Sequence, residues 1–182
     1  MIALFLILCL VVAAYDILFR RVPNSVLVSA LFVHIGYLLI LGHGIDGINV
    51  SQSFIGALVG LVIFIPLYAL RAMGAGDVKF IAVLGALLGL KYLAIAWLIG
   101  SVLAGLHSII FYASPAWMAA VPSGLYRAMQ DMAESGLVQR VMRARQGRKG
   151  IPYAAYLAIG AASTLWICLL YTSDAADDSL RV

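Results

Sequence analysis

The sequence predicts an all-α polytopic membrane protein with about six transmembrane helices. Apolar residues make up 64% of the 182 residues and charged residues only 11%, against roughly 45–50% and about 25% in soluble domains. The charges are clustered and leave long uncharged runs, each near or above the roughly 20 residues that cross a hydrocarbon core. These runs cover residues 1–15, 22–45, 47–70, 92–126 and 150–173. The composition excludes a soluble globular enzyme.

The first three spans follow from the positions of the basic residues. Residues 1–19 form the first span, because no basic residue precedes it and Arg20 and Arg21 follow it at once, which is the reverse of a secretory signal. We expect its N-terminus outside. The second span covers residues 25–41 and the third residues 54–70. The link between them contains no Lys or Arg, as expected for an external loop.

A fourth and a fifth span must share residues 80–113, because basic residues on both flanks assign the flanking links to the cytoplasm. About 16 residues, or roughly 24 Å of helix, are then available for each crossing, with a turn near residues 89–92. The last span covers residues 152–170. Ten of the twelve basic residues then lie inside and only Lys91 and Arg181 outside, which favours six spans.

We expect one membrane-embedded domain, residues 1–170, which includes a basic cytoplasmic link, residues 114–150. Apolar residues recur in this link at near-helical spacing among arginines, so it forms either a basic amphipathic helix on the inner membrane surface or a solvated loop. Residues 171–182 turn abruptly acidic and are expected to be a disordered or non-native tail. Cys9 and Cys168 are too few for a zinc site or a disulfide framework.

Two acidic residues are expected at membrane depth or at a span end: Asp16 in the first span and Asp77 just before the fourth. An ionisable group in such a place is costly and marks a functional site by default. Both fall at the cytoplasmic boundary. Two carboxyls that meet in a poorly solvated site share a proton. That gives one carboxylate to activate water and one carboxylic acid to protonate the carbonyl oxygen or the leaving amine.

A purely structural role for the two acids is the alternative. Asp16 would pair with Arg20 one turn later, and Asp77 would cap the helix that follows it. The segment Gly74-Ala75-Gly76-Asp77 favours catalysis, because glycines beside an acid let the backbone turn sharply and approach another chain closely. We expect an extended substrate to use backbone hydrogen bonds at Gly74 and Gly76.

The chain resembles the type IV prepilin peptidases, membrane aspartic peptidases of the GxGD kind. Residues 16–24 (Asp-Ile-Leu-Phe-Arg-Arg-Val-Pro-Asn) are similar to the first aspartate motif of that family, and residues 74–79 (Gly-Ala-Gly-Asp-Val-Lys) to the second. Residues 148–153 (Arg-Lys-Gly-Ile-Pro-Tyr) open an Ala/Gly-rich span and resemble the last-span motif of the short tight-adherence (Flp-type) branch.

The resemblance implies an aspartic endopeptidase that removes the leader of Flp-like type IV prepilins at the cytoplasmic face of the bacterial inner membrane, with Asp16 and Asp77 catalytic. The partners are then the lipid bilayer and a pilin-like precursor with a basic leader and a hydrophobic helix. No cofactor, metal or nucleic acid is expected. The paired cysteines of the longer, bifunctional members do not occur here, so we expect no N-methyltransferase activity. The residues expected to bind substrate or support the site are Arg20, Arg21, Asn24, Gly74, Gly76, Lys79 and Tyr153.

Two other function classes stay open. A small proton-coupled transporter would use the two acids as a relay, with broken helices, acids near the midplane and weak inverted repetition. The sequence contains neither such repetition nor a midplane acid. A non-catalytic subunit of a secretion assembly would use the acids only to satisfy arginines, and processing of precursors would not need them.

The distribution of basic residues predicts the sidedness of three positions. A cysteine introduced at Met73 or Arg143 should react only with reagents that reach the cytoplasm, and one at Asp46 should react from outside. Labelling with a membrane-impermeant maleimide in intact cells measures this. The six-span assignment is wrong if positions 46 and 143 react from the same side.

Overall fold

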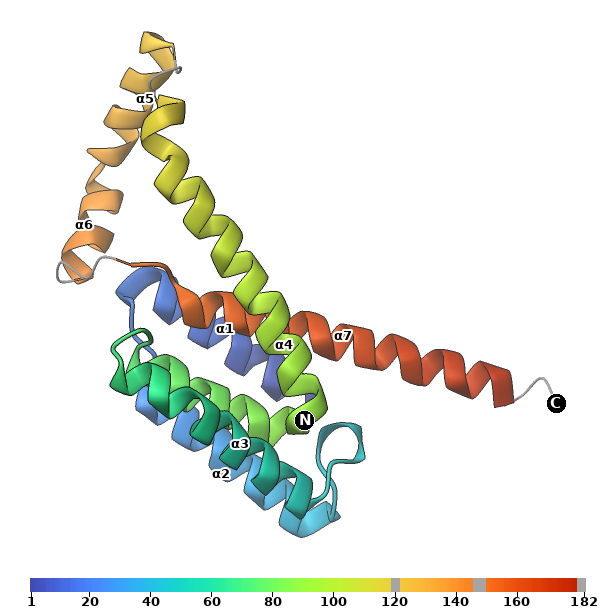
Figure 1. Ribbon diagram of the computed structural model, residues 1–182. Coiled ribbons are helices and arrows are strands. Elements are labelled where there is room, and N and C mark those ends of the chain that lie inside the picture. Colours follow the sequence, from blue (N-terminus) through green and yellow to red (C-terminus); the bar gives the residue numbers. More distant parts are fainter. Residues whose placement is uncertain (119–121, 146–149, 180–182) are drawn as a thin grey trace.

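A computed structural model describes residues 1–118, 122–145 and 150–179. This part of the chain consists of helices and short connections without a strand, so the all-α prediction is confirmed (Figure 1). The elements in chain order are α1 (Ile2–Phe19), α2 (Asn24–Leu41), the 3₁₀ turn η1 (Ile45–Gly47), α3 (Val50–Ala69), α4 (Ala75–Met118), α5 (Ser123–Ala133), α6 (Gly136–Ala144) and α7 (Tyr153–Ser179).

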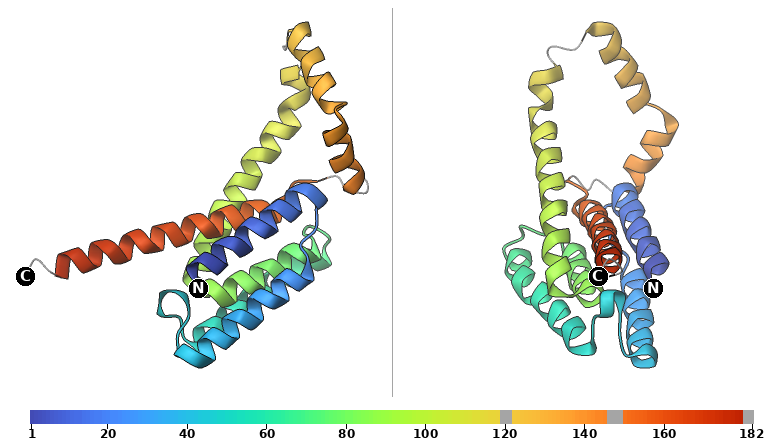
Figure 2. Two further views of the ribbon diagram at one scale, coloured as in Figure 1. Left: turned by 180° about the vertical axis from the view of Figure 1, so that it is seen from behind. Right: turned by 90° about the vertical axis from the view of Figure 1, so that its right-hand side faces the viewer.

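The helices of the bundle form two layers. Helices α1 and α7 run side by side in one layer, and α2, α3 and the first half of α4 form the other (Figures 1 and 2). Phe80, Ile81 and Leu84 in the first half of α4 are each 0% exposed. The core of the bundle therefore lies along this half helix, which begins at the segment that carries Asp77.

Helix α4 is broken at Gly89, which has φ of 68° and ψ of 176°. This conformation is open to glycine and costly for residues with a Cβ. The break lies at the turn predicted near residues 89–92. After it the chain changes direction, and the second half of α4 leads away from the bundle toward α5 (Figures 1 and 2).

Four helices of the described part are long and apolar enough to cross a membrane: α1, α2, α3, and α4 as far as Ser114. The apolar portion of α7, Tyr153–Cys168, is shorter. The two predicted spans within residues 80–113 correspond to the two halves of α4. The protein is thus a helical membrane protein, while the count of six crossings stays a prediction.

The basic link contains two short helices, α5 and α6. Apolar side chains on both helices are exposed: Leu125, Met129, Met132, Val138 and Met142. Helix α6 returns to the end of α1, where Nη2 of Arg145 donates a hydrogen bond of 2.9 Å to the carbonyl oxygen of Ile17. At the other end of the chain, α7 continues through Ser179, and the expectation that residues 171–182 form a disordered or non-native tail stays a prediction.

Glycines allow two close helix crossings. A Cβ on Gly56 of α3 would fall on the carbonyl oxygen of Gly85 in α4, and the reverse holds for a Cβ on Gly85. In the same way, Gly100 in the second half of α4 meets the backbone of α7 around Leu157, and Gly160 of α7 meets Ala96. Small residues that let backbones approach are a common basis of helix packing in membranes.

We expect Gly56→Ala to destabilise the bundle, because its methyl group has no room between α3 and α4. Overpacking of this kind costs typically about 1–3 kcal/mol. The matched control is Gly36→Ala in α2, where a Cβ would meet no atom within 4 Å and helix propensity favours alanine. Thermal unfolding of both variants in detergent measures the difference, and equal melting temperatures would contradict the tight crossing.

Candidate active site

Asp16 lies in the last turn of α1 and is 6% exposed. Its Oδ2 accepts a hydrogen bond of 3.0 Å from the backbone N–H of Ala155, in the first turn of α7. The first N–H groups of a helix have no partner within the helix, and the helix dipole is positive there. The start of α7 therefore orients the Asp16 carboxyl through a backbone donor.

Asp77 lies in the first turn of α4. The sequence predicted it just before the helix. Its backbone N–H donates a hydrogen bond of 3.1 Å to the carbonyl oxygen of Gly74, which fixes the start of the helix. Asp77 is partly buried, and it lines the same cavity as Asp16. This acid cavity has a volume of about 690 Å³. The structure thus brings the two acids from α1 and α4 to one water-accessible space.

All the residues that the sequence predicted as supporting ones line the acid cavity as well. These are Arg20, Arg21, Asn24, Gly74, Gly76, Lys79 and Tyr153. Arg148 and Lys149 of the third motif lie outside the described residues, whereas Gly150 and Ile151 of that motif line the cavity.

The two glycines before Asp77 serve close packing. A Cβ on Gly74 would lie 3.0 Å from Oδ2 of Asp77, and one on Gly76 would lie 3.2 Å from Cβ of Val22. Gly76 is already helical, and the carbonyl of Gly74 accepts hydrogen bonds from within α4. The chain thus enters the helix at once, and the glycines make room for the Asp77 carboxyl and for the α1–α2 link. The use of backbone hydrogen bonds at Gly74 and Gly76 by an extended substrate stays a prediction.

A polar contact joins α2 and α4 at the rim of the cavity. Nζ of Lys79 donates a hydrogen bond of 3.2 Å to Oδ1 of Asn24. Pro23 occupies the N-cap position of α2, and Asn24 is the first helical residue. The asparagine amide is thus not used as the helix cap that its type suggests. It holds the lysine beside Asp77.

Arg20 ends α1 with a positive φ of 54° and places its guanidinium close to that of Arg145. Burial, and then the neighbouring positive charge of Arg145, lower the pKa of Arg20. Its Nε and Nη1 atoms are buried and make no hydrogen bond within the described part of the chain. Asp16 therefore accepts its hydrogen bond from the start of α7 and not from these atoms of Arg20.

Tyr153 connects α7 with the second half of α4. Its hydroxyl forms a hydrogen bond of 3.0 Å with Oγ of Ser101, and one turn later the hydroxyl of Tyr156 bonds to Nδ1 of His107. Ser101 and Ala155 escaped the sequence analysis. A serine in an apolar run gives no signal of its partner, and any residue can supply the N–H group that Ala155 donates.

Comparison with known proteins identifies the family. A model described as the type IV leader peptidase family matches residues 3–109. The chain belongs to the type IV leader peptidase family. The matched range includes both Asp16 and Asp77, but not the third motif at residues 148–153. No curated protein and no solved structure matches the chain. Membership in this family supports a leader peptidase function acting on prepilin-type substrates.

Within the described ranges, no three His, Cys, Asp or Glu side chains are grouped as ligands of a metal ion would be. Two carboxyls of the described residues line the acid cavity, those of Asp16 and Asp77. The surrounding charges are those of Arg20, Arg21 and Lys79.

The contact between Gly74 and the Asp77 carboxyl predicts a specific loss of activity. Gly74→Ala should displace this carboxyl, because the added methyl group would lie 3.0 Å from Oδ2. A misplacement of about 1 Å can cost up to about 100-fold in rate, so we expect a loss of tenfold or more. The assay is leader cleavage, normalised to folded enzyme. Gly36→Ala is the control, and near-normal cleavage by Gly74→Ala would contradict this role.

Proposed function

We propose that this leader peptidase family member is an aspartic endopeptidase that uses Asp16 and Asp77. It removes the leader of type IV, Flp-like prepilins at the cytoplasmic face of the bacterial inner membrane. The observation that carries the proposal is that α1 and α4 bring these two carboxyls to one cavity of about 690 Å³.

The chemistry needs one proton shared by the two carboxyls. The ionised carboxyl takes a proton from a water molecule, whose oxygen attacks the carbonyl carbon of the scissile peptide, and the protonated carboxyl gives its proton to the carbonyl oxygen. The tetrahedral intermediate then collapses: its C–N bond breaks, the leaving nitrogen takes the proton that the first carboxyl removed from water, and a hydroxyl of the intermediate returns a proton to the second carboxyl. The hydrogen bond from Ala155 keeps Asp16 in place through these steps.

The cytoplasmic location rests on the basic residues around the site. Arg20, Arg21 and Lys79 line the cavity, and Lys and Arg near span ends mark the cytoplasmic side. The N-terminus of α1 then lies outside. The Flp-type assignment rests on residues 148–153 and on the lack of a Cys-x-x-Cys motif in the 182 residues. The proposed activity is therefore that of a peptidase without N-methyltransferase activity.

The two rival functions have less support. A transporter is expected to have broken helices, acids near the membrane midplane and weak inverted repetition. The break at Gly89 lies twelve residues from Asp77, or roughly 18 Å of helix. In an assembly subunit, the two acids would only form ion pairs with arginine side chains. Asp16 instead accepts the N–H of Ala155, and two buried nitrogen atoms of Arg20 make no hydrogen bond within the described residues.

We expect Asp16→Asn and Asp77→Asn each to abolish leader removal, because an amide preserves the shape of the side chain but cannot exchange the shared proton. Loss of a group that acts as part of a unit costs several orders of magnitude in rate. The experiment is co-expression with neighbouring pilin-like precursors, read by the gel shift of the processed pilin.

The matched control is Asp131→Asn on the exposed surface of α5, which makes the same chemical change outside the cavity. All three variants should insert into the membrane in wild-type amounts. If either active-site variant retains near-normal cleavage, the two-aspartate mechanism is wrong.

A further inference from the structure

A second cavity meets the acid cavity at Asp77. It has a volume of about 770 Å³ and lies between α3 and the second half of α4. The two cavities share five lining residues: Gly74, Asp77, Gly150, Ile151 and Tyr153. We call the second cavity the α3–α4 groove. A ligand that occupies the full length of the groove would reach the carboxyl of Asp77.

The walls of the groove are apolar and belong to membrane-spanning candidates. Helix α3 contributes Phe64, Leu67 and Tyr68, and α4 contributes Trp97. Phe64 and Trp97 meet edge to face, with ring centroids 5.7 Å apart, and so connect the two walls. Tyr68 is 51% exposed and Trp97 38%, which leaves their rings available to a ligand.

The wall formed by α4 presents a face of small residues. Ser101, Ala104, Gly105 and Ser108 recur at the three- and four-residue spacing that places side chains on one side of a helix. With Trp97 they extend over twelve residues, or about 18 Å of helix. A Cβ on Gly105 would meet no atom within 4 Å. The helix surface at Gly105 is therefore open, whereas neighbouring backbones pack against the helix surfaces at Gly56 and Gly100.

We propose that the α3–α4 groove binds the apolar helix of the precursor, with the end of that helix placed so that the scissile bond lies beside Asp77. This inference rests on the proposed function and specifies how its substrate is held. The occupant lies in the bilayer, because the walls are candidate spans. Small residues let an incoming helix approach closely.

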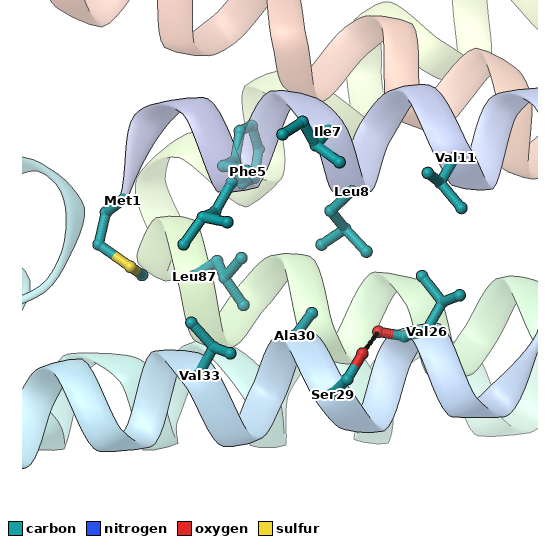
Figure 3. A pocket seen from close by; sticks show the side chains of 11 residues that line it. Met1, Phe5, Ile7, Leu8, Val11, Val26, Ser29, Ala30, Val33 and Leu87 are labelled. Atoms are coloured by element: carbon teal, nitrogen blue, oxygen red, sulfur yellow. Dashed lines mark hydrogen bonds between the residues drawn. The ribbon is translucent and has the colours of Figure 1, made fainter.

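The charges of the groove fit an apolar helix. Arg71 and Asp77 are the only charged residues among its described lining, whereas the acid cavity carries five charged side chains. Continuity with Asp77 also separates the groove from the apolar cavity between α1 and α2. That cavity has a volume of about 220 Å³ (Figure 3) and is lined by neither Asp16 nor Asp77. A helix bound there would not bring its end to the acids.

Photo-crosslinking tests the occupant directly and does not depend on catalysis. A benzoyl-phenylalanine replaces Gly105 in one variant and Gly36 in another, since both glycines lie in helices with open space at the Cβ. Each full-chain enzyme is placed in nanodiscs and irradiated with a full-length pilin-like precursor, at a concentration above the raised KM that a side chain at position 105 is expected to cause. We expect a cross-link from position 105 to the apolar helix of the precursor, and none from position 36.

Every other result at position 105 overturns the proposal. A cross-link to a second copy of the enzyme would make the groove an interface between copies, a cross-link to lipid alone would make it a lipid site, and no cross-link during normal cleavage would place the substrate elsewhere. Failure of the proposed function is a separate result: the asparagine variants would still cleave, whatever position 105 contacts.

Kinetics supply a second, independent measurement. Gly105→Leu adds a side chain to the groove at a position where a Cβ would meet no atom within 4 Å. It should raise KM for the precursor about tenfold with kcat within about twofold, as expected for lost ground-state binding. Gly36→Leu adds the same side chain to α2 and should leave both constants unchanged. Both variants should melt at or above the wild-type temperature. Equal KM values for the two variants would contradict the docking of a helix at Gly105.

Discussion

The hydrogen bond from the backbone of Ala155 to the Asp16 carboxyl is the constraint on which the site depends. It connects the end of the first helix to the start of the last, across 139 residues of sequence. The start of α7 is itself held by the second half of α4, through the Tyr153 hydroxyl and the close crossing at Gly100. The position of Asp16 is thus determined by two other helices.

The other acid depends on a different set of contacts. Helix α4 begins at Ala75, and the close crossing of Gly56 and Gly85 fixes its first half against α3. The approach of Gly76 to Val22 then places the start of α4 beside the α1–α2 link. Both acids consequently lie on packed helices. Sites carried by regular elements hold a geometry more accurately than sites carried by loops, and the proposed sharing of a proton by the two carboxyls requires such accuracy.

The break at Gly89 gives one helix two roles. The first half of α4 is buried in the core and carries Asp77, while the second half diverges, holds α7 and forms a wall of the α3–α4 groove (Figures 1 and 2). The polar acid cavity and the apolar groove therefore adjoin, and Asp77 is among the residues that line both. This division suits a substrate with a polar bond to be hydrolysed and an apolar helix to be held, because the two parts need opposite environments.

The sequence by itself determined the helical membrane fold, the approximate ends of α1, α2 and α3, and the turn at Gly89. It also singled out Asp16 and Asp77 as candidate site residues. Apolar runs, basic flanking residues and glycines at turns are local signals. Only the tertiary structure decided that Ala155 orients Asp16, that Asn24 holds Lys79, and that Gly74 and Gly76 make room for packing. The groove at Gly105 was equally hidden. A backbone donor can belong to any residue type, and a helix face is open only when no other helix packs against it. Neither feature can therefore be predicted from the local sequence.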